Sequence, residues 1–141
     1  MNTLDKDMQK KLAGAAIRAR ERAYAPYSNF KVGAALLASD GVIYTGCNIE
    51  NAAYSPTICA ERTAFAKAVS EGARNFKAIA IAGWKEAGEP GMAYPCGVCR
   101  QTMMEFVEPR ALEVIVVRSE EDWRVHRLEE LLPYGFGPNN L

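Results

Sequence analysis

The sequence has no excess of charge of either sign, since 17 lysines and arginines balance 17 aspartates and glutamates over 141 residues. Nucleic acids and anionic membrane surfaces attract proteins through broad basic fields, so this balance argues against both as partners. The chain also lacks a run of the roughly 20 apolar residues that a membrane span needs. Residues 1–20 are charged and contain no apolar segment of signal-peptide length. These absences predict a cytoplasmic protein.

Cysteine and histidine are scarce, with 4 cysteines and 1 histidine. In a chain without an export signal, a reducing environment is expected, and thiol clusters there usually bind metal or take part in catalysis rather than form disulfides. Internal repeats, low-complexity tracts and linkers are missing as well. With 49% hydrophobic and 24% charged residues, the composition is that of an ordinary globular protein. One α/β domain over residues 1–141 is therefore expected.

The order of helices and strands follows from periodicity and from the placement of proline and glycine. The first helix is expected to begin after a Thr3 cap and to end near Ala23, before Pro26. Two further helices and one helical turn are predicted at 59–71, 96–107 and 129–132. Strands are predicted at 30–38, 42–47, 76–82, 112–117 and 125–128, of which the first two form a hairpin. Loops are expected at 48–57 and 84–94.

Three thiols and one carboxylate form the most informative pattern in the chain. Cys59 lies two residues before Glu61, and Pro95-Cys96-Gly97-Val98-Cys99-Arg100 follows downstream. The order C-x-E … P-C-x-x-C is the signature of zinc-dependent deaminases, with cysteine where histidine often stands. Three ligands leave one of the four tetrahedral positions of zinc open for water, as in a catalytic site. The pattern therefore predicts an enzyme.

The same spacing suggests how these residues share the chemistry. The cysteines fall where a loop meets a helix, and a helix N-terminus lowers thiol pKa and stabilises thiolates. Glu61 needs no metal-binding role and can accept a proton from the water in the open position. Three thiolates donate electron density to zinc and make it a weaker Lewis acid. Arg62 and Arg100 are expected to hydrogen-bond to thiolate sulfur and so to reduce this donation.

Other interpretations of the cysteines remain open at this point. Pro-Cys-x-x-Cys is also found in thioredoxin-like redox pairs and in half of a structural zinc ribbon. A ribbon needs a fourth ligand, for which Cys47 and His126 are the candidates, and each falls in a predicted strand remote from the pair. We expect Cys47 to be a small buried apolar residue and His126 to be a surface residue. Glu61 argues against a non-catalytic zinc-binding module.

Beyond the signature, ordered blocks along nearly the whole chain resemble the small, homotetrameric class of cytidine deaminase. They are Tyr24-Ala25-Pro26-Tyr27-Ser28 with Phe30-Lys31-Val32-Gly33-Ala34-Ala35, Gly46-Cys47-Asn48-Ile49-Glu50-Asn51-Ala52-Ala53-Tyr54, Cys59-Ala60-Glu61-Arg62, the Pro95–Gln101 block, and Leu131-Leu132-Pro133-Tyr134-Gly135-Phe136-Gly137-Pro138. The resemblance implies a three-layer α/β/α fold around a five-stranded mixed sheet. The Trp84–Tyr94 loop has no motif that we can match to it.

The resemblance also implies a set of roles. It implies one zinc ion per subunit on Cys59, Cys96 and Cys99, with Glu61 as the proton shuttle. Substrate-binding roles would fall to Asn48 and Glu50 on the ribose hydroxyls, Phe30 on the pyrimidine, and backbone groups near Ala60 on the base. Phe136 would reach the site of a neighbouring subunit in a homotetramer with shared active sites, and Tyr54 would lie near subunit contacts.

The hypothesis from the sequence is hydrolytic deamination of cytidine and 2′-deoxycytidine, with release of ammonia, in pyrimidine salvage. A small-molecule nucleoside suits the chain better than a nucleotide, because no glycine loop or basic cluster that would bind phosphate lies near these residues. Deamination of another aminopyrimidine nucleoside, such as a nucleoside antibiotic like blasticidin S, remains the alternative within the class.

Overall fold

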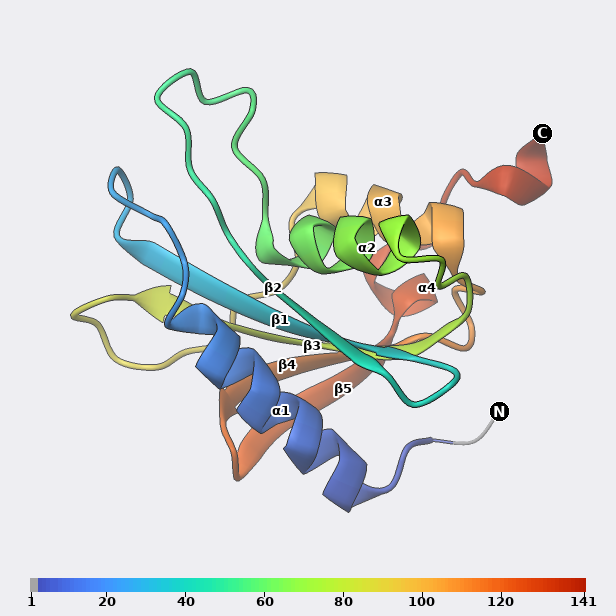
Figure 1. Cartoon of the computed structure of the whole chain (residues 1–141). Coiled ribbons are helices and arrows are strands. Elements are labelled where there is room, and N and C mark those ends of the chain that lie inside the picture. Colours follow the sequence, from blue (N-terminus) through green and yellow to red (C-terminus); the bar gives the residue numbers. More distant parts are fainter. Residues whose placement is uncertain (1–2) are drawn as a thin grey trace.

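A mixed β-sheet forms the centre of the computed structural model, which describes residues 3–141. Its five strands are β1 (Phe30–Ala38), β2 (Ile43–Cys47), β3 (Phe76–Lys85), β4 (Glu113–Ser119) and β5 (Asp122–Arg127), in the order β2-β1-β3-β4-β5. Only the β3–β4 pair is parallel, and the other three pairs are antiparallel. Helices cover both faces of the sheet (Figure 1).

Side-chain alternation along the central strands creates two apolar cores. On β1, Ala34 and Leu36 face one core, whereas Ala35 and Leu37 face the other. Side chains of β3 and β4 also alternate between the two cores. The central strands are therefore buried on both faces, and their sequences are nearly continuous apolar runs. The expected three-layer α/β/α fold around a five-stranded mixed sheet is confirmed.

Two helices lie side by side on the core that contains Ala34 and Leu36, and one helix packs on the core that contains Ala35 and Leu37 (Figure 1). Helix α1 (Lys6–Arg20) covers the face that carries Ala35 and Leu37, while α2 (Ala60–Ser70) and α3 (Gly97–Phe106) cover the other. A short helix, α4 (Leu128–Leu131), follows β5 and contacts α3. Among residues 3–141, no helix is long and apolar enough to cross a membrane.

Several predicted boundaries were wrong by a few residues. Asp5, rather than Thr3, caps α1, because its carboxylate accepts the Met8 N–H at 2.8 Å. The helix ends at Arg20, whose guanidinium is buried against the carbonyls of Trp84 and Lys85 at 2.9 and 3.2 Å. Those carbonyls belong to β3.

Strands β3, β4 and β5 are longer than predicted, and the clearest causes are the antiparallel partners of β3 and β5. Strand β3 runs on to Lys85 since Phe30, at the start of β1, pairs with that residue. Strand β5 begins at Asp122 because Trp123 pairs with Val117 of β4 and donates its indole N–H to Gln9 at 3.1 Å. Neither cause is visible in local periodicity.

Two glycines on neighbouring strands set how closely the helices approach the sheet. A Cβ at Gly33 would lie 2.1 Å from the Ala16 carbonyl oxygen in α1, and one at Gly46 would lie 2.6 Å from the Ala60 carbonyl oxygen and the Ala64 nitrogen in α2. Because both contacts are with backbone, any larger residue would push the helix away. Gly46 therefore fixes the first turns of α2.

Candidate active site

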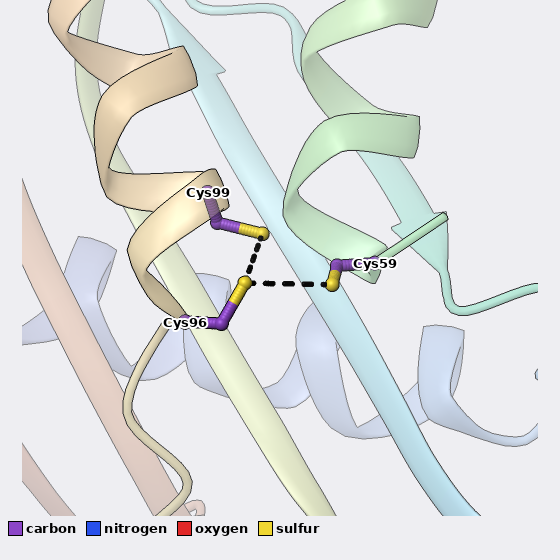
Figure 2. Close-up of side chains that lie close together, drawn as sticks. All are labelled: Cys59, Cys96 and Cys99. Atoms are coloured by element: carbon purple, nitrogen blue, oxygen red, sulfur yellow. Dashed lines mark hydrogen bonds between the residues drawn. The ribbon is translucent and has the colours of Figure 1, made fainter. Parts of the chain in front are cut away.

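Two of the three thiols in the C-x-E … P-C-x-x-C pattern occupy the N-cap positions of two neighbouring helices. Cys59 caps α2 and Cys96 caps α3, both with extended backbone, and neither side chain makes the usual cap hydrogen bond. An N-cap residue normally accepts a bond from a helical N–H, but these sulfurs face each other instead (Figure 2). Cys99, on the first turn of α3, is buried and completes the group.

The sulfur spacing fits a tetrahedral metal ion. The Sγ atoms of Cys59 and Cys96 lie 3.8 Å apart and those of Cys96 and Cys99 lie 3.5 Å apart. All three sulfurs lie within 4.8 Å of one another, and all four cysteines are free thiols. Zinc–sulfur bonds of about 2.3 Å at a tetrahedral angle place two sulfurs about 3.8 Å apart. The three residues therefore suit zinc as ligands.

The thiols already differ in their affinity for protons. A hydrogen bond from the Cys99 thiol lowers the pKa of Cys59 to about 5, and Arg62 contributes to the shift. The same hydrogen bond to Cys59, followed by burial, raises the pKa of Cys99. The cluster thus favours one thiolate, and ionisation of all three thiols requires the charge of a bound cation.

Glu61 lies beside the cluster on the first turn of α2 and is only 4% exposed. Burial, with a smaller contribution from the negative charge of Cys59, raises the pKa of its carboxyl to about 7 against the opposing effects of its own backbone N–H, the Cys99 thiol and Arg62. A buried carboxyl with a pKa near neutrality can both accept and return a proton, as a general acid–base catalyst must.

The two arginines that were expected to contact sulfur behave differently. Arg62 directs Nη2 to Cys59 Sγ at 3.6 Å and to the Thr57 carbonyl at 3.4 Å. Arg100 makes its hydrogen bonds elsewhere: Nε donates to the Pro95 carbonyl at 2.7 Å and Nη1 to the Leu131 carbonyl at 2.6 Å. Arg100 therefore does not hydrogen-bond to thiolate sulfur as expected, but to two backbone carbonyl groups.

Asn48 and Phe30 lie where β1 begins. The Asn48 side chain accepts the Val32 N–H and donates to the Phe30 carbonyl, both at 2.8 Å. This leaves one N–H and one lone pair of the amide for a further partner. The Phe30 ring lies against Gly83 of β3 and is half-buried.

Glu50 is held by the turn before β1. Its carboxylate accepts the N–H groups of Tyr27 and Ser28 at 2.9 and 3.1 Å and also the Ser28 hydroxyl. The hydroxyl bond, followed by the two backbone bonds, holds the pKa of Glu50 below its usual value. A surface pocket of about 390 Å³ opens here, lined by Tyr27, Ser28, Glu50, Asn51, Tyr54 and Thr57.

Of the remaining predicted residues, one is buried at the start of α2 and two are exposed on segments that extend from the molecule. Ala60 is fully buried at the start of α2. The segment 48–58 extends beyond the sheet, and the tail extends from the end of the molecule that carries α3 (Figure 1). Tyr54 on the first of these is 74% exposed, and Phe136 on the tail is 57% exposed.

Cys47 and His126 lie outside the thiol cluster. Cys47 is half-buried on β2, and burial raises the pKa of its thiol. His126 lies on β5, where Nε2 is 3.1 Å from the Tyr94 hydroxyl. Among residues 3–141, the group that can hold a metal contains only Cys59, Cys96 and Cys99.

Three residues that sequence reasoning missed position the site. Gly46 sets the approach of α2, the Thr63 hydroxyl ties α2 to the Cys47 carbonyl at 3.0 Å, and Ser28 holds Glu50. Gly46 and Ser28 stand in the blocks that carry the family resemblance, but nothing local to them indicates such contacts.

Comparisons with known proteins agree with this geometry. The model of the family described as "Cytidine and deoxycytidylate deaminase zinc-binding region" matches residues 6–116, which include all three thiols and Glu61. A cytidine deaminase of Sporosarcina psychrophila is 50% identical over 132 residues, covering 94% of this chain and 93% of the relative. A probable cytidine deaminase of Dictyostelium discoideum is 41% identical over 138 residues, covering 98% and 90% of the two chains.

Solved structures give the same result. The crystal structure of a cytidine deaminase from Burkholderia pseudomallei matches with a TM-score of 0.81 and 49% identity, over 89% of this chain and 97% of that one. The one from Mycobacterium tuberculosis matches with a TM-score of 0.76 and 37% identity, over 96% and 99% of the two chains. Together with the thiol cluster, these matches confirm zinc as the cofactor, and the chain belongs to the cytidine and deoxycytidylate deaminase family.

Proposed function

We propose that this chain catalyses the hydrolytic deamination of cytidine and 2′-deoxycytidine to uridine and 2′-deoxyuridine, with release of ammonia, as a step of pyrimidine salvage. The observation that carries the proposal is the buried Glu61 carboxyl, with its pKa near 7, beside three thiols at zinc spacing. A structural metal site has no need of such an acid–base group.

Cys59, Cys96 and Cys99 would hold one zinc ion in each subunit. Bound there, zinc supplies a Lewis acid that brings the pKa of water towards neutrality. The Arg62 guanidinium, 3.6 Å from Cys59 Sγ, partly neutralises the charge of the thiolates and orients one of them.

Glu61 carries the proton through the reaction. Its carboxylate accepts a proton from the attacking water and delivers it to N3 of the pyrimidine as the C4–O bond forms. Glu61 then takes the proton of the new C4 hydroxyl and passes it to the amino nitrogen, so that the C4–N bond breaks, the C4 carbonyl forms and ammonia leaves. Low exposure protects these transfers from bulk water, because only 4% of the residue is accessible.

Substrate recognition falls to residues that follow β2, begin β1 and begin α2. The free N–H and lone pair of Asn48 and the carboxylate of Glu50 suit ribose hydroxyls, which both donate and accept hydrogen bonds. Phe30 would pack on the ring, and backbone groups near Ala60 would contact the base. The pocket at Glu50 is lined by an acidic residue and no basic one, which favours a nucleoside over a nucleotide.

We further propose a homotetramer in which a neighbouring subunit completes each site. The exposed rings of Tyr54 and Phe136 support this, because large aromatic side chains on segments that extend from the body are typical of contact surfaces. A reducing, cytoplasmic compartment suits a site that needs three free thiols. Residues 1–141 would form a single catalytic domain.

The test is the fall in ultraviolet absorbance when purified protein is mixed with cytidine, 2′-deoxycytidine, deoxycytidylate or blasticidin S. We expect turnover of the two nucleosides, loss of turnover after a chelator removes the metal, and recovery when zinc is added back. Turnover of blasticidin S without turnover of cytidine would assign the alternative substrate, and no turnover with fully loaded zinc would refute the proposal.

A further inference from the structure

The two residues that follow the ligand Cys99 hold backbone outside their own helix. Arg100 and Gln101 both lie on the first turns of α3, directly after Cys99. Their side chains donate to carbonyl groups at Pro95, Leu131 and Phe136. None of these three bonds lies within α3 itself, so the side chains connect the helix to its surroundings.

Arg100 joins two segments through one guanidinium. Nε donates to the Pro95 carbonyl at 2.7 Å, and Nη1 donates to the Leu131 carbonyl at 2.6 Å. Pro95 is buried directly before the ligand Cys96, and Leu131 is the last residue of α4, where the tail begins. The guanidinium is planar and rigid, so its two donors fix one carbonyl relative to the other.

Gln101 holds the tail near the ring of Phe136. Its Nε2 donates to the Phe136 carbonyl at 2.9 Å. The following residue, Gly137, packs against Met104 of the same helix, whose Cε would lie 3.0 Å from a Cβ at that position. Because the Phe136 ring itself is 57% exposed, the contacts with α3 hold the backbone of the tail and leave the ring free to point outward.

We propose that Arg100 and Gln101 are positioning residues that fasten the tail to the helix carrying Cys99, so that one helix sets both the thiol ligands and the place of Phe136. The consequence for catalysis rests on the proposed function, in which Phe136 completes the site of a neighbouring subunit. Arg100 acts on both the Cys96 loop and the tail, whereas Gln101 acts on the tail alone.

The sharpest test replaces the donor of Gln101 without changing its shape. Gln101→Glu cannot donate to the Phe136 carbonyl, and Gln101→Leu checks that any effect is due to the lost donor rather than to the added charge. We expect faster amide hydrogen exchange in residues 132–141 and a KM for cytidine raised about 3- to 10-fold, the usual effect of one lost hydrogen bond, with kcat and zinc content unchanged. Glu105→Gln, an exposed position on the same helix, is the matched control.

A second experiment tests Arg100. Arg100→Lys keeps the charge, but one ammonium on a flexible stem does not hold both carbonyls in a fixed relation. We expect a raised KM together with faster zinc loss to a chelator, whereas Gln101→Glu should not change zinc loss. The proposal would be overturned if both Gln101 variants kept amide hydrogen exchange in residues 132–141 and KM at control values. It would also be overturned if Arg100→Lys lost zinc at the wild-type rate. Amide hydrogen exchange and the rate of zinc loss test the proposal even if the wild-type protein fails to deaminate cytidine.

Discussion

Cys59 and Cys96 occupy the same structural position, the N-cap, on α2 and α3, and their sulfur atoms lie 3.8 Å apart. Two positive helix ends therefore converge on one point, which favours the accumulation of thiolate charge there. The same arrangement joins the helices, because a metal held by both caps fixes one helix relative to the other. Metal binding and the packing of this layer are thus expected to depend on each other.

Cys59→Ala should abolish stoichiometric zinc binding, because two thiols alone cannot complete the site. The protein should also unfold at lower temperature, since the junction between α2 and α3 loses its metal. Metal analysis and thermal unfolding of the purified variant check both effects.

Cys47→Ala and His126→Ala are the matched controls, because both residues lie outside the thiol cluster. Each should retain one zinc ion per chain. Zinc loss in His126→Ala would show that a fourth protein ligand had been overlooked, and full zinc with full activity in Cys59→Ala would disprove the ligand assignment.

Glu61→Gln should keep the fold and the zinc but lose nearly all turnover. The amide is close in size to the carboxyl yet cannot accept and return a proton, and a positioned acid–base group contributes about 10²- to 10⁴-fold in rate. Because one residue serves several transfers, we expect the upper end of this range or beyond, measured as kcat on cytidine.

Glu71→Gln at the exposed C-terminal end of α2 should turn over like the wild type. If Glu61→Gln kept more than roughly a tenth of wild-type turnover, the shuttle role would have to be abandoned.

The parts of the fold and site that could be predicted from sequence are those set by local chemistry. The C-x-E and P-C-x-x-C spacings identified the thiols, since Cys96 and Cys99 are three residues apart and can share one helical turn, and Glu61 follows Cys59 by two residues. Strand β1 was predicted over its whole length because Phe30–Ala38 is apolar at every position except Lys31. Resemblance to a family then supplied the layer order, which no local pattern contains.

The parts that could not be predicted depend on partners distant in sequence. The sequence places Arg100 beside a ligand and so suggests a bond to sulfur, but the Leu131 carbonyl is brought to it only by the tertiary fold. Strand β3 extends because Phe30 pairs with Lys85. Gly46 looks like any strand glycine until α2 is packed on it.

Gly46→Ala should displace the first turn of α2, because the new Cβ would meet the Ala60 carbonyl oxygen and the Ala64 nitrogen at 2.6 Å. Backbone atoms cannot rotate away, so we expect a stability loss of about 1–3 kcal/mol, the usual cost of overpacking. Turnover should fall as well, since Glu61 moves with that turn. Chemical unfolding and kcat measure the two effects.

Gly91→Ala is the matched control, because a Cβ there meets nothing within 4 Å. It should change neither quantity. Wild-type turnover in a destabilised Gly46→Ala protein would mean that the position of α2 is not critical for catalysis.

Glu50 should stabilise the fold in a pH-dependent way. Its folded-state pKa lies below the ordinary value of 4.5, chiefly because Ser28 donates to the charged form. The unfolded chain therefore binds the proton more readily, and stability from this group is present above about pH 4.5 and is lost as pH falls through the folded pKa. Glu50→Gln should be less stable than the wild type near neutrality, and the difference should shrink in acid.

Urea unfolding midpoints of wild type and Glu50→Gln across this pH range give the comparison, with Glu129→Gln, an exposed residue of α4, as the control. A difference between Glu50→Gln and wild type that stayed constant down to pH 3 would show that the carboxylate charge is not what holds the turn.

Phe136 should act in the site of a neighbouring subunit. Its ring is 57% exposed on a tail that extends away from the body, so it is not buried in its own chain. Phe136→Ala should therefore weaken nucleoside binding more than it disturbs zinc content, and removal of the chain from Pro133 onward should do the same more strongly. Light scattering should show a tetramer for the wild type, and a monomer at micromolar concentration would refute the shared site.

Mixing two impaired proteins decides whether sites are shared. Phe136→Ala chains keep Glu61 but lack the ring, while Glu61→Gln chains keep the ring but lack the acid. If each site takes Glu61 from one chain and Phe136 from another, mixed tetramers contain some sites with both, and part of the turnover returns after subunit exchange. Phe136→Ala mixed with inactive chains that carry both substitutions is the control, because no arrangement of those chains yields a complete site. If the first mixture is no more active than this control after subunit exchange is complete, each subunit works with its own tail.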